Sequence, residues 1–309
     1  MKFKLRRYFI YYLLRAGFFL LGLIPLKVSL SVAAFLGRRA AKIASGYTAI
    51  AVDNLDKALG EDPERNARIA EKVFVNLAKN GAEWIKLSMM DPSRIGEVVT
   101  EAEGLENLDA VLEKGKGALV LGFHFGNWEL LGLYLKQKGY SGALVAKRIY
   151  FHKYNELLEN LRGRYGAPVI YRDESPRKML KELVSGRILG IVPDQDVESV
   201  DGEFVEFFGR PAYTPTAPVK LAIAAGTQIV PIFIVRKEDN THKMIVETPI
   251  DAASRDNTGQ NVKELTQKWT TVLEDYVRKY PDQWVWIHKR WKTRPSGNSG
   301  KTAAAGAEI

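Results

Sequence analysis

Two hydrophobic patterns divide the chain near Pro92. From Gly46 to about Met90 the apolar residues recur at helical spacing, and Asp62 followed by Pro63 marks the start of a second helix within that stretch. After Pro92 the apolar residues gather in short runs bounded by Gly, Pro and Asp, which is typical of buried strands. The pattern therefore predicts a helical N-terminal region followed by a region that contains a sheet.

Six short apolar runs are the candidate strands. Helical patterns separate most of them, as over residues 129–138, 154–165 and 176–184. Alternation of strand and helix predicts an α/β fold, with a largely parallel sheet flanked by helices. Residues 207–218, FFGRPAYTPTAP, read as a loop that leads into a helix. The six runs cover residues 117–123, 142–146, 167–171, 187–193, 227–235 and 243–248.

An apolar stretch near the N-terminus has the composition of a membrane segment. It covers residues 8–26, YFIYYLLRAGFFLLGLIPL, and Arg15 alone interrupts it. A length of 19 residues could just span a hydrocarbon core of about 30 Å. An arginine near the middle costs roughly 2.5–3.5 kcal/mol, so an interfacial helix whose arginine reaches the headgroups is equally allowed. We expect residues 1–45 to form a membrane anchor or amphipathic segment.

The positive charge of the chain is concentrated in the same region. No acidic residue precedes Asp53, whereas nine of the 45 basic residues do, so the remaining 36 balance the 36 acidic residues. Basic side chains beside an apolar helix suit an anionic cytoplasmic leaflet. Nucleic acid is not an expected partner, because no basic stripe is left in the balanced remainder. A cleavable signal peptide ending near residues 31–34 is the competing interpretation, but Pro25 and Lys27 come early for it.

The amino-acid composition excludes several kinds of functional site. The chain has no cysteine, which excludes disulfides, thiolate metal sites and cysteine nucleophiles. Its 309 residues suit one large domain with an N-terminal attachment. We place that domain at residues 46–295. The last residues, 296–309, are compositionally a disordered tail.

The stretch HFGNWE, residues 124–129, holds the main candidate for catalysis. His124 follows a predicted buried strand, at the edge where parallel sheets bind ligands, and Glu129 opens the next helix. Gly126 allows a tight turn between them. A carboxylate on one ring nitrogen would leave the other as a general base for a substrate hydroxyl. A buried histidine beside a helix-start glutamate, with no catalytic role, is the alternative.

Four ordered blocks resemble the bacterial lipid A biosynthesis acyltransferases. HFGNWE is similar to their His-x4-Asp/Glu signature. Residues 192–233, which begin VPDQDVESVDGEF, are similar to the second long block of the family. Residues 280–295, YPDQWVWIHKRWKTRP, resemble its C-terminal hallmark, and residues 51–59, AVDNLDKAL, complete the set. The resemblance extends to about Pro295.

The resemblance implies a fold like that of the glycerol-phosphate acyltransferases and a specific reaction. Members transfer a fatty acyl chain from acyl carrier protein to a hydroxyl of a lipid A precursor, at the cytoplasmic face of the bacterial inner membrane. His124 is then the base and Glu129 its orienting partner. No covalent enzyme intermediate, cofactor or metal is implied, and acyl carrier protein is a co-substrate.

Further candidate site residues lie in residues 147–166, which are similar to another segment of the family, and in two of the four blocks. Arg162 and Arg164 lie where the family has an arginine that supports the active site, and either could bind phosphate or a developing oxyanion. Arg148 lies at a strand end, and Asn127 lies within the motif. Two further candidates, Asp194 and Asp196, belong to PDQD and are interpreted as orienting or structural groups in the pocket wall.

Two other functions stay open on the sequence. The first is the same chemistry on another membrane acceptor, such as a lysophospholipid or a different glycolipid. The second is a lipid-binding scaffold without catalysis, against which His124 and Glu129 argue, because binding alone needs no general base. Acyl length and the acylated position depend on a pocket built from distant residues, so the sequence does not define them.

Overall fold

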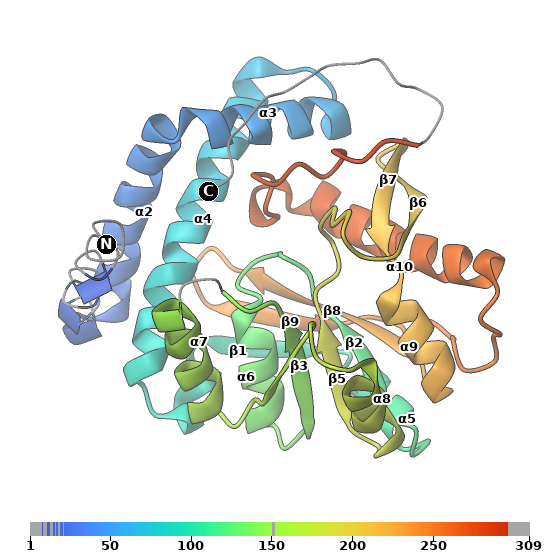
Figure 1. Cartoon of the computed structure of the whole chain (residues 1–309). Coiled ribbons are helices and arrows are strands. Elements are labelled where there is room, and N and C mark those ends of the chain that lie inside the picture. Colours follow the sequence, from blue (N-terminus) through green and yellow to red (C-terminus); the bar gives the residue numbers. More distant parts are fainter. Residues whose placement is uncertain are drawn as a thin grey trace.

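A computed structural model describes residues 8, 11–12, 15, 17, 19–20, 22–149 and 152–295 of the chain (Figure 1). The predicted apolar stretch over residues 8–26 lies only partly within these residues, and the predicted tail over residues 296–309 lies outside them. Among the described residues, no helix combines the length and apolar character needed to cross a bilayer.

From Leu26 to Met89 the described chain forms three helices, and α2 runs alongside α4 (Figure 1). The predicted start of α4 is confirmed, because the Asp62 carboxylate accepts the backbone N–H of Arg65 at 2.9 Å and Pro63 opens the helix. Gly37 of α2 lies so close to α4 that a Cβ there would stand 2.7 Å from the Cα of Val75. Residues 26–43 therefore pack on the rest of the protein. The helices are α2 (Leu26–Ile43), α3 (Ser45–Leu59) and α4 (Pro63–Met89).

The centre of the fold is a seven-stranded sheet in the order β1-β9-β8-β2-β5-β3-β4. All neighbouring strands pair in parallel except β8 and β9, which are antiparallel. The predicted fold class is thereby confirmed, and each of the six apolar runs overlaps a strand. The strands are β1 (Val99–Glu103), β2 (Ala118–Leu121), β3 (Gly142–Ala146), β4 (Val169–Tyr171), β5 (Ile188–Ile191), β8 (Ile229–Arg236) and β9 (His242–Val246).

Helices cover both faces of this sheet and bury it. Alternate residues of β2 enter two different apolar clusters, with Leu119 and Leu121 in one, and Ala118 and Val120 in the other. The predicted helix at residues 176–184 has the bounds of α8. The helices of this part are α5 (Leu105–Leu112), α6 (Glu129–Gln137), α7 (His152–Arg164), α8 (Pro176–Val184), α9 (Ala217–Ala225) and α10 (Gly259–Lys279), with short 3-10 turns η1 (Pro92–Glu97) and η2 (Pro281–Gln283).

The prediction of a loop over residues 207–218 is wrong. Strands β6 (Gly202–Phe207) and β7 (Arg210–Pro215) form an antiparallel hairpin there. Its two-residue turn places Phe208 at φ 55° and Gly209 at φ 68°, the positive values that tight hairpin turns need. Prolines are tolerated because this two-stranded sheet has only edge strands. The hairpin packs against α10, where Gln267 bonds the backbone of Glu206.

Candidate active site

His124 lies where sequence reasoning expected it, in the turn between β2 and α6. Its side chain is 23% exposed. The turn passes so close to β8 that a Cβ at Gly126 would stand 1.8 Å from the carbonyl oxygen of Ile234, and Gly126 has φ +57°. Only glycine fits both conditions, so the close backbone bend predicted at Gly126 is confirmed.

Asp194 is the carboxylate that holds the His124 ring. Its Oδ1 lies 2.7 Å from Nδ1 of His124, while its Oδ2 accepts the backbone N–H of His124 at 2.9 Å and the indole N–H of Trp284 at 2.8 Å. Asp194 is fully buried. Because β2 and β5 are paired neighbours, the residues that follow them meet at the same sheet edge. Asp194, which the sequence suggested as an orienting or structural group, thus contacts the His124 ring directly.

Glu129 has a different partner from the predicted one. Arg162 of α7 donates to both of its oxygens, from Nε at 3.1 Å and from Nη2 at 2.7 Å. The prediction that Glu129 orients the His124 ring is corrected, since Asp194 already occupies Nδ1 and the planar guanidinium fork matches the Glu129 carboxylate. Arg162, one of the two arginines expected to bind phosphate or an oxyanion, is bound to Glu129 instead.

The charges around His124 favour its protonated form. Burial alone would lower the pKa of His124, but the negative charge of Asp194, its hydrogen bond and then the charge of Glu129 raise the pKa above its ordinary value. Burial would raise the pKa of the Asp194 carboxyl, but the charge of His124 and the bonds it accepts hold that pKa well below its usual range. The pair therefore stabilises an imidazolium once a proton has been taken.

The structure separates the remaining predicted residues from the His124–Asp194 pair. Asn127 is 2% exposed and donates to Glu83 at 2.7 Å, so the prediction that it binds substrate is corrected: its amide is used inside the protein. Asp196 accepts the backbone N–H and hydroxyl of Thr293, both at 2.7 Å.

The two other predicted arginines lie at the surface. Arg148 is half-exposed, lies 3.4 Å from Asp173 and stacks over the ring of Tyr171 at 3.6 Å. Arg164 is exposed and lines a groove between α7 and α4. Among the four candidates Asn127, Arg148, Arg162 and Arg164, only Arg164 has no hydrogen bond or ion pair within the described part of the chain.

A buried charge cluster behind the turn was missed by sequence reasoning. Glu83 of α4 is 1% exposed and accepts hydrogen bonds from Arg236, from Nε2 of His242 at 3.1 Å and from Asn127. Burial would raise the pKa of Glu83, but His242 and Arg236 lower it to about 2. Asn80, one turn earlier in α4, donates to the carbonyl of Gly126 at 2.6 Å. Helix α4 therefore holds the backbone and one side chain of the turn that carries His124.

The C-terminal hallmark block supplies the other wall of the site. Trp284 pairs with Phe125 as an isolated bridge, and the N–H of Val285 donates to the carbonyl of His124 at 3.1 Å. The N–H of Gly126 donates to the carbonyl of Gln283 at 2.8 Å. Trp284 is fully buried, so this aromatic belongs to the core and holds Asp194 in place. A short local motif could not have indicated these contacts.

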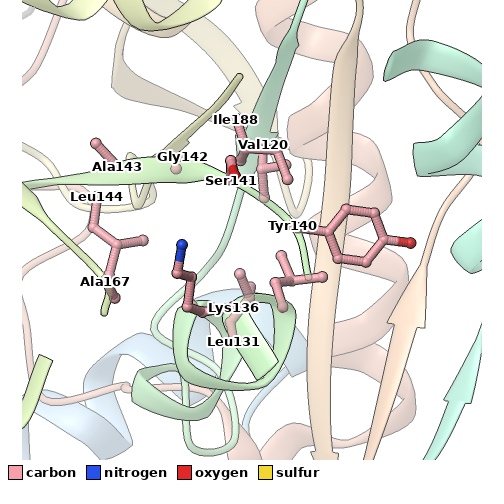
Figure 2. A pocket seen from close by; sticks show the side chains of 13 residues that line it. Val120, Leu131, Lys136, Tyr140, Ser141, Gly142, Ala143, Leu144, Ala167 and Ile188 are labelled. Atoms are coloured by element: carbon pink, nitrogen blue, oxygen red, sulfur yellow. The ribbon is translucent and has the colours of Figure 1, made fainter. Parts of the chain in front are cut away.

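Two features bear on ligands. In the part of the chain that the structure describes, no group of three or more His, Asp or Glu side chains is placed to hold a metal ion. Figure 2 shows a cavity between α6 and strands β3 and β5, with Leu131, Lys136 and Leu144 around it. Its volume of about 30 Å³ is that of one water molecule, far below the 300–1,000 Å³ usual for ligand pockets. His124 and Asp194 do not line it.

Comparisons with known proteins show what this chain is similar to. The lipid A biosynthesis lauroyltransferase of Escherichia coli is 27% identical over 284 residues, which cover 89% of this chain and 88% of the relative. The phosphatidylinositol mannoside acyltransferase of Mycolicibacterium smegmatis is 26% identical over 244 residues, 77% of each chain. A crystal structure of the 1-acyl-sn-glycerophosphate acyltransferase of Thermotoga maritima covers 84% of this chain and 99% of its own, with a TM-score of 0.38 and 13% identity.

The family model described as bacterial lipid A biosynthesis acyltransferase matches residues 1–293. That span includes the turn that carries His124, the Asp194 carboxylate that holds its ring and nearly all of the C-terminal block. The chain therefore belongs to the bacterial lipid A biosynthesis acyltransferase family and is an acyltransferase.

Proposed function

We propose that this protein moves a fatty acyl chain from the thioester of acyl carrier protein to a hydroxyl of a lipid A precursor, at the cytoplasmic face of the bacterial inner membrane. The observation that carries the proposal is the His124–Asp194 pair. Asp194 holds Nδ1, and Nε2 has no hydrogen-bond partner among the described residues. A partly exposed imidazole held in this way suits a general base for a substrate hydroxyl.

The reaction follows from this geometry in two steps. Nε2 of His124 takes the proton of the acceptor hydroxyl as its oxygen attacks the thioester carbonyl carbon, and Asp194 stabilises the imidazolium that forms. The tetrahedral intermediate then collapses, the carbon–sulfur bond breaks, and the leaving thiolate takes the proton back from His124. The acyl group passes directly to the acceptor, so no enzyme nucleophile or cofactor takes part.

Glu129 assists through charge in this proposal. The Arg162 guanidinium binds both carboxylate oxygens, so Glu129 is fixed while its charge still raises the pKa of His124. Both side chains are mostly buried, at 18% and 14% exposure, where charges interact more strongly than in water. We assign Arg162 the role of a positioning residue for Glu129.

The exposed face of α2 supports a membrane-surface location. Val32, Phe35, Leu36 and Ile43 are exposed, and basic side chains such as Arg39 accompany them. A helix with exposed apolar residues beside cations suits the interface of an anionic leaflet. We propose that the N-terminal segment and α2 together lie on the inner membrane.

A second acceptor class is favoured by one comparison. The mycobacterial relative is named for acylation of a phosphatidylinositol mannoside, so a glycolipid other than a lipid A precursor is the alternative acceptor. The chemistry at His124 would be the same, because only the hydroxyl that enters the site changes.

Mass spectrometry of lipids formed in vitro tests the proposal. The purified full chain is incubated with lauroyl acyl carrier protein and, in separate reactions, a bisphosphorylated glucosamine disaccharide precursor, a lysophospholipid and a phosphatidylinositol mannoside. We expect the disaccharide to gain one acyl chain and His124→Ala to abolish that gain. Exclusive acylation of another acceptor would overturn the lipid A assignment. Transfer from lauroyl coenzyme A but not from the carrier protein would overturn the donor.

A further inference from the structure

A groove lies between α4, α7 and two residues of the N-terminal segment. Its volume is about 440 Å³, within the range of lipid and small-molecule sites. Trp84 and Ile85 of α4 and Leu157 and Leu161 of α7 form apolar walls. The groove is therefore large enough and apolar enough for a hydrocarbon chain.

Two cations line this apolar groove, and each has a carboxylate in its wider surroundings, Asp91 for Arg164 and Glu156 for Arg15. Neither Arg15 nor Arg164 forms an ion pair with a carboxylate in the described part of the chain, and Arg15 donates to the hydroxyl of Tyr11 at 3.3 Å. Arg162, two residues before Arg164, is by contrast fully engaged with Glu129. Guanidinium groups that are not held in an ion pair, beside an apolar wall, suit a ligand that carries both a phosphate and a hydrocarbon chain.

Trp84, a residue that lines the groove, carries a donor without an acceptor. The indole N–H of Trp84 is buried and has no hydrogen-bond partner among the described residues. A buried donor that stays unsatisfied costs about 1–3 kcal/mol, so such a group is expected to meet an acceptor in some functional state. A phosphate, ester or hydroxyl oxygen of a lipid would supply one.

The groove is continuous with the proposed membrane-facing surface. Phe19 and Met89 line it and are themselves exposed, at 59% and 42%. Helix α2, whose apolar face is exposed, packs alongside α4. A lipid could therefore enter from the membrane with its chain against apolar side chains throughout.

We propose that this groove binds the acceptor lipid through one acyl chain and one phosphate, with Arg15 and Arg164 on the phosphate. The proposal rests on the proposed function and deepens it, because it says which part of the acceptor is recognised. Helix α7 then serves both sites: Arg162 fixes Glu129, while Leu161 and Arg164 line the groove. In this proposal the groove recognises the phosphate of the acceptor, whereas the hydroxyl that reacts binds separately, at His124.

Binding of dodecyl phosphate, measured by calorimetry, tests the groove without any catalysis. The probe is titrated into the full chain in neutral detergent micelles, for the wild type and for the Arg15→Ala/Arg164→Ala double variant. We expect the double variant to bind at least about tenfold more weakly, since each charge-assisted bond contributes that much. Arg68→Ala is the matched control, because Arg68 lies on α4, is exposed and pairs with Glu64 outside the groove. Equal affinities for the wild type and the double variant would overturn the proposal.

Kinetics then separate the acceptor from the donor. With a phosphorylated acceptor we expect the double variant to raise KM for the acceptor and to leave both kcat and KM for the acyl carrier protein unchanged. The dephosphorylated acceptor should show no difference between wild type and variant. A raised KM for the donor instead would mean that the donor chain occupies the groove. If the wild type acylates none of the acceptors, the proposed function fails, whereas the dodecyl phosphate titration still decides the groove.

Discussion

Asp194 holds the ring of His124 at 2.7 Å although 70 residues separate them in the chain. The contact exists because β2 and β5 are neighbours, so the turns that follow them share one edge of the sheet. The carboxylate close by in sequence, Glu129, is bound by Arg162 instead. Each of these carboxylates should therefore affect catalysis differently.

His124→Ala should lower acyl transfer by about 10²–10⁴, because it removes the group that takes the hydroxyl proton. Asp194→Asn should lower it by a similar factor, since the amide can hold the ring in the wrong tautomer and no longer stabilises the imidazolium. Single-turnover transfer and a melting curve are measured on each variant. Near-wild-type transfer by folded His124→Ala would refute the proposed mechanism, in which His124 is the general base.

The pH dependence of kcat/KM should report the same pair. His124 acts as a base only when neutral, and its pKa is raised by Asp194, so activity should rise with pH through an apparent pKa above the ordinary histidine value. Asp194→Asn removes the charge that raises this pKa, so the rising limb should move to lower pH while the plateau falls. A limb that stays in place in the variant would show that another group titrates.

Arg162→Lys should lower the rate although the positive charge is kept. A lysine offers one ammonium in place of the fork that donates to both oxygens of Glu129, so the carboxylate is held less firmly. Glu129→Gln should lower transfer through loss of charge near His124. Arg94→Lys is the control, because Arg94 forms a similar two-oxygen pair with Glu97 on the surface. Unchanged kinetics for Arg162→Lys would remove Arg162 from the site.

Glu83→Gln should destabilise the fold by about 3–5 kcal/mol, because it leaves Arg236 as a buried charge without its counterion. The exposed partner of Arg94 offers a matched comparison, and Glu97→Gln should change stability by no more than about 1 kcal/mol. Denaturant unfolding measures both. A small effect at Glu83 would mean that water or a rearranged side chain compensates the charge.

Substitutions on the exposed face of α2 test membrane attachment better than deletion of residues 1–45. Deletion would remove the packing of Gly37 and Leu30 against α4 and so disturb the fold itself. Val32→Ser and Leu36→Ser should each weaken sedimentation with anionic vesicles by roughly tenfold, since each loses apolar burial of about 1.5 kcal/mol. Thr48→Ser is a neutral control on α3. Undiminished sedimentation of the double variant would refute docking through this face.

Local patterns explain which parts of the fold could be predicted. The buried strands were found because β2, β5 and β8 are covered on both faces and read as apolar runs. Strand β1 was missed, since of its residues only Val99 is fully buried. The hairpin was missed because Pro211 and Pro215 read as loop signals, and the constraint that places them in an edge strand is tertiary.

Only those parts of the site that lie within one short segment of the chain could be predicted from the sequence. His124 and Gly126 were found because one motif contains both the base and the bend. The pairing with Asp194 depends on strand order, and the pairing of Glu129 depends on where α7 packs, and neither is encoded nearby in the chain. One signal for Glu83 was present: Asn76, Asn80 and Glu83 recur at helical spacing, which is unusual polarity for a face that turns inward.

The contacts of Trp284 and Val285 with the turn at His124 have a consequence for synthesis of the protein. His124 and Asp194 are translated well before residues 283–285, yet both are contacted by these later residues, which form hydrogen bonds to the turn at His124 and to Asp194. Domains form as the nascent chain emerges, N-terminal parts first, so the sheet can assemble while its catalytic edge is still open. In the proposed mechanism, the site at His124 is therefore complete only after residues 283–285 have been translated and have packed against the turn.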